Sequence, residues 1–443
     1  MLYKILLGLF ILMQLNVVHA QIIKTYKLKA DSACSTEKSL LVISGHEIPL
    51  LSGTKADSLS LFSISQGTVH SIVLQIDQKD NQGRYILSND PSERFASRKI
   101  LGDYDELVFR KKDLGERLNS SLLLKGKLNG ELKGKLDPLP LIEIQVVDEH
   151  SDADNKKTSG WLYLAAEGIA VNAGTINSNK QKEFLIYESA RDTVISSVYK
   201  IAFSKDKPFL LDAFQWRLSG RIAGQSEWSW SPDVVDTMKI RHTGHFFGFP
   251  FKRTDDDYSS QLVAVKAGPL RIIRRTENKV KVFWKLKSPA LYIDYVMMPD
   301  GFVMASMIDI PFNISIFFSH LITITTMDWN NEYKQSDLMI ISQQGKLKLP
   351  VNGQPTDAKD AFNHISAKQF SVSSKLGLFE VKLAIADDFP LHSQLYLRDA
   401  LDEIDKPENY PGQFGNVGFK TTGWENIDTK LHHLKFTVCV DKM

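Results

Sequence analysis

Residues 255–311 place the tightest constraint on the fold, because their apolar and polar side chains alternate over short runs. Between residues 279 and 287 the alternation is almost unbroken, with lysines at 279, 281, 285 and 287. Successive side chains of a strand point to opposite faces, so this period of two predicts a strand with one basic face. Gly268-Pro269 and Pro299-Asp300-Gly301 provide turns. The stretch therefore predicts consecutive strands and leaves no room for a helix of ordinary length.

The same pattern of short runs separated by Gly, Pro or charged groups extends along the rest of the chain. We predict an all-β protein with a small N-terminal β-domain over residues 21–148 and a linker or surface loop over residues 149–160. Residues 161–443 are expected to form a large antiparallel β-sandwich. The best helix candidates are short and cover residues 357–365 and 397–404.

The first twenty residues have the order of a secretory signal peptide: Lys4, then an apolar run over residues 5–13, then Val18-His19-Ala20. The run is shorter than the roughly 20 apolar residues of a membrane-spanning helix, although a retained anchor is the alternative. We therefore expect a protein exported to the periplasm, cell surface or extracellular space. Residues 308–324 are the most apolar later segment, and Asp309, Pro311, Asn313 and His320 interrupt them. No transmembrane span is expected after removal of the signal.

Charge gives no support to nucleic acid as a partner, because 54 basic side chains nearly balance 52 acidic ones. The two cysteines, Cys34 and Cys439, are more informative. An oxidising compartment lets them pair if the fold brings them together, and such a bond would contribute about 4 to 5 kcal/mol in the chain-entropy model. Two separate buried thiols are the alternative.

Two short patterns resemble known families. Gly45-His46-Glu47-Ile48-Pro49-Leu50, with the strands at residues 72–77 and 105–109, resembles the N-terminal β-module of secreted bacterial proteins related to exo-acting rhamnogalacturonan lyases. Gly268-Pro269-Leu270-Arg271 entering a strand is similar to the supersandwich of galactose-mutarotase-like proteins, which include polysaccharide lyases and sugar-acting hydrolases. The resemblance implies a supersandwich-like large domain and a carbohydrate substrate.

Acidic and histidine clusters are the candidate metal ligands. Asp103, Asp105 and Glu106, with Asp77 and Asp80 nearby in sequence, offer the oxygen donors that calcium prefers. A second set combines His242 and His245 with the acidic run at residues 255–257. Residues three apart on a strand point to opposite faces, so the two histidines converge only across a bend at Gly244. Solvated acidic turns are the alternative interpretation of both sets, and no other cofactor is expected.

Candidate catalytic residues follow from the needs of a lyase, which requires a base beside a group that neutralises charge. His242, His245, Tyr258 and Arg271 have suitable side chains, and nothing in the sequence shows that they meet. Nucleophile-elbow, phosphate-loop and zinc-protease motifs are missing from the sequence.

Carbohydrate binding would use aromatic planes and cations. Trp228 and Trp230 flank one serine and share a strand face if the segment is extended, with Trp216, Arg217 and Glu227 close in sequence. Lys281 and Lys285 belong to a basic face that also includes Arg271, Arg274, Arg275, Lys279 and Lys287, with Trp284, Tyr292 and Tyr295 beside it. Buried tryptophans and lysines that protect a strand edge are the alternative interpretations.

Taken together, these observations favour an exported, noncatalytic binding or surface-assembly protein whose partner is a polysaccharide or another cell-envelope component. A polysaccharide lyase or glycoside hydrolase is the alternative. An outer-membrane-associated protein is a second alternative, but residues 88–113 and 151–157 carry too many charges for strands that face lipid.

Overall fold

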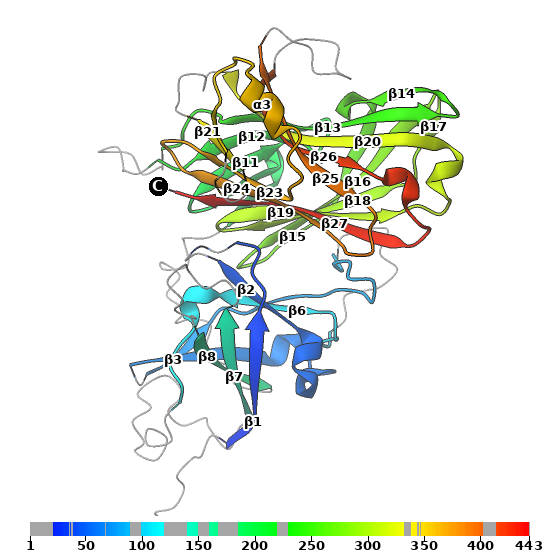
Figure 1. Ribbon diagram of the computed structural model, residues 1–443. Coiled ribbons are helices and arrows are strands. Elements are labelled where there is room, and N and C mark those ends of the chain that lie inside the picture. The colour runs from blue at the N-terminus through cyan, green and yellow to red at the C-terminus, as the bar shows by residue number, and fades with distance from the viewer. Residues whose placement is uncertain are drawn as a thin grey trace, which may run out of the picture. The chain divides into compact units, whose positions relative to one another are not determined.

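The computed structural model describes residues 21–34, 36, 39–66, 68–88, 99–118, 140–148, 159–166, 185–218, 229–331, 338–342, 345, 347–401 and 413–442. The predicted signal peptide and most of the predicted linker lie outside these ranges. The chain divides into two compact units, one formed by residues Met1–Ile86 and Phe95–Lys182, the other by Leu87–Arg94 and Glu183–Met443. Both units are built from strands (Figure 1), which confirms the predicted all-β class.

Among the described residues, the first unit contains two sheets that share one apolar core, and a smaller apolar cluster lies on the other face of β3 and β8. The five-stranded sheet has the order β1-β7-β8-β3-β4 and the three-stranded sheet the order β2-β6-β5. Their strands are β1 (Gln21–Ala30), β2 (Leu40–Ser44), β3 (Leu59–Ser65), β4 (Thr68–Ile72), β5 (Gln75–Asp77), β6 (Glu106–Arg110), β7 (Pro140–Asp148) and β8 (Ser159–Ala166). Alternate residues of facing strands, such as Leu41 and Leu162, are fully buried in this core.

The predicted boundary at residue 160 is wrong, because β8 belongs to the first unit. β8 pairs with β7 from Leu141↔Ala165 to Val147↔Ser159, and with β3 from Leu59↔Ala166 to Phe62↔Tyr163. The apolar run at residues 161–166 marks a buried strand correctly, but a run of this kind does not reveal which sheet the strand joins.

The second unit contains three sheets, with the orders β12-β11-β10-β9, β14-β13-β20-β26-β25 and β15-β16-β18-β19-β27-β24-β23-β21-β22, and β17 pairs with β16. The strands up to β19 are β9 (Ile186–Glu188), β10 (Thr193–Ile195), β11 (Tyr199–Phe203), β12 (Leu211–Trp216), β13 (Val235–Phe246), β14 (Phe249–Arg253), β15 (Tyr258–Ala267), β16 (Ile272–Phe283), β17 (Leu286–Lys287), β18 (Leu291–Met298) and β19 (Gly301–Asp309). The later strands are β20 (Phe318–Trp329), β21 (Met339–Ser342), β22 (Lys348–Pro350), β23 (Gln369–Ser373), β24 (Leu378–Ile385), β25 (His392–Ala400), β26 (Gln413–Thr422) and β27 (Leu431–Asp441).

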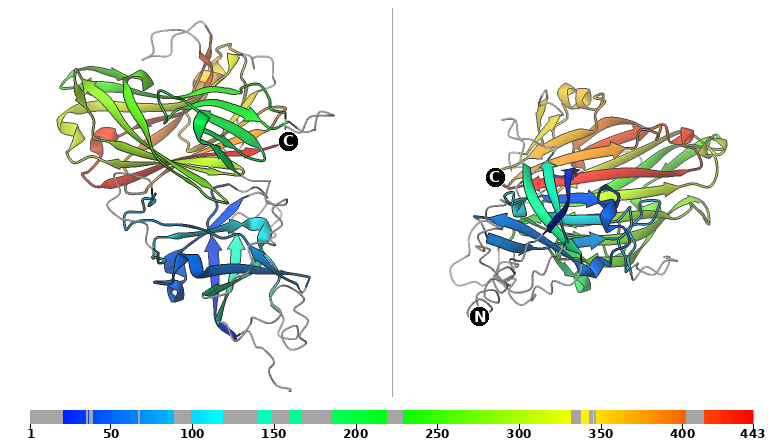
Figure 2. Two further views of the ribbon diagram at one scale, coloured as in Figure 1. Left: turned by 180° about the vertical axis from the view of Figure 1, so that it is seen from behind. Right: turned by 90° about the horizontal axis from the view of Figure 1, so that it is seen from below.

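The sheets of the second unit pack face to face as a sandwich, which the views in Figure 2 show from two further sides. β24 illustrates why its residues form a strand of this kind: its burial alternates residue by residue, so that Phe379, Val381 and Leu383 face the core. The ring centre of Phe419 in β26 lies 5.3 Å from that of Phe370 and 5.9 Å from that of Phe436, and both of these residues belong to the opposite sheet. The core therefore joins the inner faces of both sheets.

Helices are short throughout the described residues. The predicted helix at residues 357–365 is confirmed as α3 (Asp357–Phe362), whose N-cap Thr356 accepts a hydrogen bond from the backbone N–H of Lys359. The 3-10 turns are η1 (Gly45–Glu47), η2 (Pro49–Leu51), η3 (Ala56–Ser58), η4 (Lys111–Asp113), η6 (Ser189–Arg191), η7 (Asp255–Asp257), η8 (Ile314–Ile316) and η11 (Trp424–Asn426). In the part of the chain that the structure describes, no helix combines the length and apolar composition that crossing a bilayer requires.

The other helix prediction, at residues 397–404, is wrong as far as residue 400, where β25 ends; residues 402–404 lie outside the described part. Leu395, Leu397 and Asp399 alternate with more exposed residues and face inward. Asp399 is buried because it pairs with the ammonium group of Lys359 and accepts backbone hydrogen bonds from Gly353 and Gly415, each at 3.0 Å. The helix prediction failed because an acidic residue is unusual on the buried face of a strand, so the sequence suggested the polar face of a short helix.

The two cysteines form a disulfide bond, which confirms the predicted pairing of Cys34 with Cys439. Both residues are buried. Cys34 precedes β2 in the first unit and Cys439 lies in β27 of the second. The bond therefore joins two positions that are far apart in the sequence.

Candidate functional site

The strands at one end of the second unit extend beyond their neighbours. β20 pairs with β26 only from Thr323 onward, so its first five residues project past β26. In the opposite sheet β18 pairs with β16 only as far as Asn278, so the last five residues of β16 project in the same way. β17 folds back along the projecting end of β16, and β14 folds back along the end of β13, which lies beside β20. The two sheets thus continue past the filled core with apolar side chains still facing inward.

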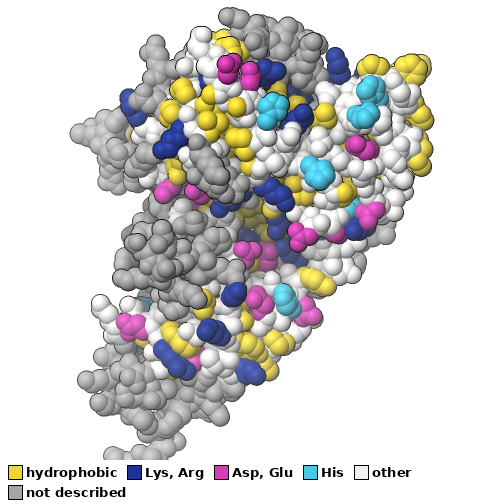
Figure 3. All heavy atoms as spheres, in the orientation of Figure 1, with side chains coloured by type: hydrophobic (Ala, Val, Ile, Leu, Met, Phe, Trp, Pro, Cys, Tyr) yellow, Lys and Arg dark blue, Asp and Glu magenta, His cyan; other side chains and the backbone are white. Residues whose placement is uncertain are grey.

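An apolar pocket of about 470 Å³ lies between these projecting ends. Thirteen of the sixteen described residues that line it are apolar, and six are phenylalanines. The lining is formed by His242, Phe246, Phe247, Phe251, Val280, Val282, Leu286, Lys287, Ser288, Pro289, Ile310, Phe312, Ile314, Phe317, Phe318 and Leu321. Its size falls in the range of about 300 to 1,000 Å³ typical of small-molecule sites. Figure 3 shows hydrophobic side chains gathered at this end, over β14 and β17.

Two tight hairpins form part of the pocket mouth, and both have strained tips. The pair Phe246↔Phe249 closes a loop of two residues, Phe247 and Gly248, whose φ angles are +49° and +81°. The pair Phe283↔Leu286 closes the second loop, in which Trp284 has φ +45°. Gly and Asn are the usual residues at such positions, because a side chain with a Cβ is strained there. Large aromatic residues at these tips therefore point to a role outside folding.

His242 is a half-buried polar residue in the pocket wall. Its Nδ1 lies 2.9 Å from the Thr323 hydroxyl and its Nε2 lies 2.6 Å from the Tyr258 hydroxyl. Burial lowers the pKa of His242 to about 4, because the apolar surroundings disfavour the charged form. Burial also raises the pKa of Tyr258, with a smaller contribution from Asp255. Both groups are therefore neutral at physiological pH, and both ring nitrogens of His242 already have partners.

Of the four predicted catalytic residues, the structure brings together only His242 and Tyr258. Tyr258 pairs with Val280 of β16, whereas Arg271 precedes Val280 by nine residues, immediately before β16 begins. Nine residues of extended chain span about 30 Å. Arg271 is also buried. The geometry thus separates the predicted base from the predicted charge neutraliser.

His245 does not join His242, although the predicted irregularity occurs. The pairing of β13 with β20 shifts register between Thr243 and His245. His245 is exposed, does not line the pocket, and has its ring 6.0 Å from that of His320. The acidic run at 255–257 forms η7, where Asp256 pairs with Lys207 at 2.5 Å. Among the described residues, no group of three or more His, Cys, Asp or Glu side chains is arranged to hold a metal ion.

The predicted calcium ligands of the first unit are engaged elsewhere. Asp105 is buried and accepts backbone hydrogen bonds from Lys79 at 2.9 Å and Gly102 at 2.8 Å. Glu106 pairs with the ammonium group of Lys79 and accepts a hydrogen bond from the Tyr85 hydroxyl at 3.0 Å. Asp103 is exposed and accepts a hydrogen bond from the Ser52 hydroxyl. Asp77 accepts from Gln75, and Asp80 pairs with Arg84. These carboxylates orient backbone and cations and do not converge as a calcium site.

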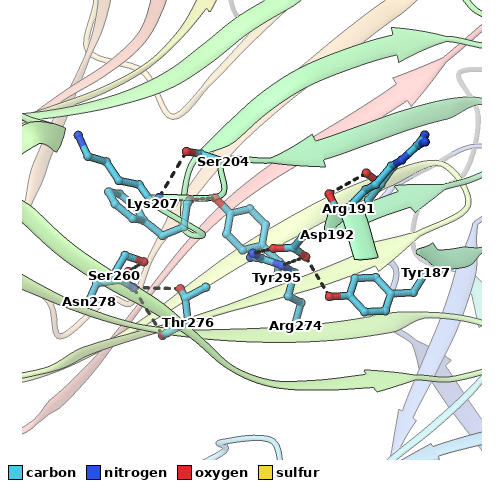
Figure 4. Close-up of polar contacts among 12 residues, drawn as sticks. Tyr187, Arg191, Asp192, Ser204, Lys207, Ser260, Arg274, Thr276, Asn278 and Tyr295 are labelled. Carbon is cyan, nitrogen blue, oxygen red and sulfur yellow. Dashed lines mark hydrogen bonds and ion pairs between the residues drawn. The ribbon is translucent and has the colours of Figure 1, made fainter. Parts of the chain in front are cut away.

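The predicted basic face is wrong in its first half. Arg271, Arg274 and Arg275 are buried, and Asp192 and Phe203 of the β9–β12 sheet and its turns cover Arg274. Figure 4 shows Arg274 beside Asp192 and Tyr295. Its Nε donates to Asp192 Oδ1 at 2.7 Å, and its guanidinium lies 3.9 Å from the centre of the Phe203 ring. Arg275 forms a similar buried pair with Asp294 at 2.7 Å.

The predicted carbohydrate ligands fall in separate places. The backbone of Trp230 forms an isolated β-bridge with that of Arg217, next to β12. The centre of the Trp230 ring lies 5.5 Å from the Lys200 ammonium group. Lys281 and Lys285 are exposed on the β16–β17 hairpin, which Figure 1 shows well apart from β12. Trp228 and Glu227 lie outside the described residues. Trp216 is fully buried in the core, as the alternative interpretation predicted, and so is Tyr295.

The apolar pocket itself was missed in the sequence. A usable signal exists: Phe246-Phe247-Gly248-Phe249 and Phe283-Trp284 are turns rich in aromatic residues, where polar residues normally predominate. The segment at 310–321 adds three phenylalanines and three isoleucines and contains no Asp, Glu, Lys or Arg. Comparison with known proteins offers no further guidance, since neither a family model nor a curated protein matches this chain.

Proposed function

We propose that this chain is an exported, noncatalytic binding protein that holds an apolar chain, of the kind found in lipids, in the pocket between β13, β16 and β20. The observation that carries the proposal is the pocket of about 470 Å³ with its thirteen apolar lining residues. Burying a hydrocarbon chain against such a wall is favourable by about 0.8 kcal/mol per methylene group. The strained aromatic residues at the mouth support the same role.

One end of the ligand is proposed to be polar or anionic. Lys287 is the single cation among the described lining residues, and its ammonium group lies 3.1 Å from the Ser259 hydroxyl near the surface. A carboxylate or phosphate beside Lys287 would keep its charge partly solvated while the hydrocarbon fills the interior. Export is supported by the predicted signal peptide and by the disulfide, a bond typical of oxidising compartments.

Calorimetric titration with dodecanoate tests the proposal. We expect one chain to bind with a dissociation constant on the order of micromolar, and dodecanol to bind more weakly because it lacks a charge for Lys287. The variant Leu321→Trp fills the pocket and should weaken binding at least about tenfold. Leu262→Trp is the matched control, because Leu262 is exposed on β15 and does not line the pocket.

Equal affinities for the two tryptophan variants, or no binding of dodecanoate to the wild type, would contradict the proposal. Carbohydrate affinity and the lyase or hydrolase alternative stay predictions. Incubation of the purified protein with pectins, uronans and neutral glycans tests them independently of the pocket.

A further inference from the structure

Exposed apolar side chains concentrate around the pocket mouth. We call three segments the rim: residues 246–253, 281–289 and 310–321. Of the twelve large hydrophobic residues exposed in the described part of the chain, seven belong to the rim: Phe247, Phe249, Phe283, Trp284, Leu286, Phe312 and Ile316. Trp284 and Phe249 are the most exposed, at 78% and 75%. Three of the seven, Phe247, Leu286 and Phe312, also line the pocket, so the exposed apolar patch is continuous with the pocket wall.

The charge of the rim has one sign. Its three segments contain Lys252, Arg253, Lys281, Lys285 and Lys287, and no aspartate or glutamate. The whole chain, by contrast, has 54 basic and 52 acidic side chains. Arg253 has a structural role, since its guanidinium donates to the backbone carbonyls of Lys281 and Val282, whereas the four lysines are exposed. The acidic run that follows β14 is engaged, Asp256 with Lys207 and Asp257 with the backbone N–H of Thr254.

The hairpin tips present the aromatic and basic residues together. Trp284 and Lys285 are the two loop residues of the β16–β17 hairpin. Phe249 begins β14, and the exposed Lys252 lies three residues later on the same strand. The rings Phe246 and Phe283, 6.4 Å apart, join the two hairpins across the mouth. Tryptophan and phenylalanine favour the boundary between headgroups and hydrocarbon of a bilayer, and lysines beside them attract anionic headgroups.

We propose that the rim docks on an anionic lipid bilayer, with Trp284 and Phe249 inserted at the headgroup boundary and Lys252, Lys281 and Lys285 against the headgroups. A protein partner would require hydrogen-bonding groups around an apolar centre. The rim instead surrounds its apolar residues with cations of one sign, which matches a lipid surface. This docking is separate from ligand binding inside the pocket, although it would bring the pocket mouth to the acyl chains.

Co-sedimentation with large unilamellar vesicles tests the docking. We expect the wild type to bind vesicles of phosphatidylcholine that contain about one quarter phosphatidylglycerol, at least about tenfold more tightly than vesicles of phosphatidylcholine alone. High salt should weaken this binding, because it screens exposed lysines. No binding to either vesicle, or equal binding to both, would overturn the proposal.

Matched variants locate the contact. Trp284→Asn removes the ring at a position whose positive φ suits asparagine, and it should weaken vesicle binding about tenfold. Tyr104→Asn, an equally simple loss of an exposed ring in the first unit, should leave binding within about twofold. Lys281→Glu with Lys285→Glu should abolish preference for the anionic vesicle. Lys205→Glu with Lys348→Glu changes net charge equally outside the rim and should preserve it.

The outcomes separate docking from pocket binding. The rim variants are expected to bind dodecanoate within about threefold of the wild type, because Trp284, Lys281 and Lys285 do not line the pocket. A protein that binds dodecanoate but no vesicles would overturn the docking alone. Rim variants that bind vesicles as tightly as the wild type would also overturn it. Weaker vesicle binding by Tyr104→Asn would place the contact in the first unit.

Discussion

The buried guanidinium of Arg274 and the partly buried carboxylate of Asp192 form a pair that holds β16 against the turn before β10. Asp192 has φ +44°, a conformation that asparagine and aspartate tolerate better than most residues. The Tyr187 hydroxyl donates to the same carboxylate at 3.0 Å. Burial, followed by the charge of Asp192, raises the pKa of Tyr187 to about 12. The pair therefore sits in surroundings that penalise a lone charge.

Removing one partner of this pair should cost more than removing both. We expect Arg274→Met to lower the free energy of unfolding by about 1 to 3 kcal/mol, because it leaves the partly buried Asp192 carboxylate without its cation. The double variant with Asp192→Asn should recover part of that loss. Urea unfolding of the wild type, both single variants and the double variant measures the coupling. Additive losses would show that the two groups do not act as a pair.

His242 should make stability depend on pH. Its pKa is about 4 in the folded chain and ordinarily 6.5. Between these values the unfolded state binds more protons, so the free energy of unfolding falls as pH falls through this window and levels off below pH 4. The loss is at most about 3 kcal/mol.

The difference between wild type and His242→Gln isolates this contribution, because other titrating groups such as Asp233 cancel. Denaturant unfolding between pH 7 and pH 4 should therefore show a shallower fall for the variant. A wild type and a variant with parallel pH profiles would mean that His242 titrates alike in both states.

At the residue scale, the sequence pattern identified residues with suitable side chains but did not predict which of them are buried. Lys281 and Lys285 are exposed, as predicted, but the single strand predicted over residues 279–287 is wrong, because a turn at Trp284 and Lys285 folds it into the β16–β17 hairpin. The predicted exposure of Arg274 is also wrong. Residues of the β9–β12 sheet and its turns cover Arg274, whereas the second half of β16 is more exposed. Coverage by a distant sheet has no signature in the strand that it covers.

At the scale of single elements, the β16–β17 hairpin stores strain at Trp284. For a residue with a Cβ, the left-handed backbone conformation costs roughly 1 to 2 kcal/mol of conformational free energy, and for asparagine it costs less. Trp284 is 78% exposed and gives up little packing when replaced. We therefore expect Trp284→Asn to raise the free energy of unfolding by up to about 1 kcal/mol, measured by urea unfolding.

Tyr104→Asn provides the comparison, since Tyr104 is exposed without a positive φ and should show no gain. If Trp284→Asn were instead destabilising, the ring would contribute to folding, and the case for a role in binding would weaken. A gain in stability together with a loss of vesicle binding would show that the tip is shaped for function.

Most strands were predictable because their burial follows a period of two, and α3 was predictable from Thr356 and the polar run after it. β25 was misread because Asp399, buried beneath Lys359, breaks the apolar face of the strand. The hairpin tips could have been identified from Phe247-Gly248 and Trp284-Lys285, where aromatic residues occupy turns.

At the scale of the whole molecule, the disulfide joins two positions that are far apart in the sequence. Cys34 and Cys439 are the two cysteines of the chain, and they pair with each other. We expect Cys34→Ala, Cys439→Ala and the double variant to lose similar amounts, about 2 to 5 kcal/mol, from the free energy of unfolding. Peptide mapping without reductant should recover the linked peptides from the wild type.

Additive losses for the two alanine variants would contradict this expectation, because they would show two residues that act separately. Far-ultraviolet circular dichroism provides the control, since both units should keep their strands in every variant. The pairing itself was left open by the sequence, because spacing does not reveal whether distant segments meet.

The pocket could not be assembled from the sequence for the same reason. Its wall combines residues from β13, β16 and the segment before β20, which are 30 to 80 positions apart. Each contributes an apolar face that is ordinary for a strand in a sandwich. Only the projection of these strands past β18 and β26 leaves the faces unfilled, and that projection depends on the pairing of all the neighbours.

The claim that the pocket holds an apolar chain is tested most directly by nuclear Overhauser effects between bound dodecanoate and the protein. We predict contacts from the terminal methyl group of the chain to the ring protons of Phe251 and Phe318, both of which line the pocket. The carboxylate end should contact Lys287. Contacts confined to Trp284 and Phe249, which are exposed and do not line the pocket, or no contacts with any of these residues, would contradict the account.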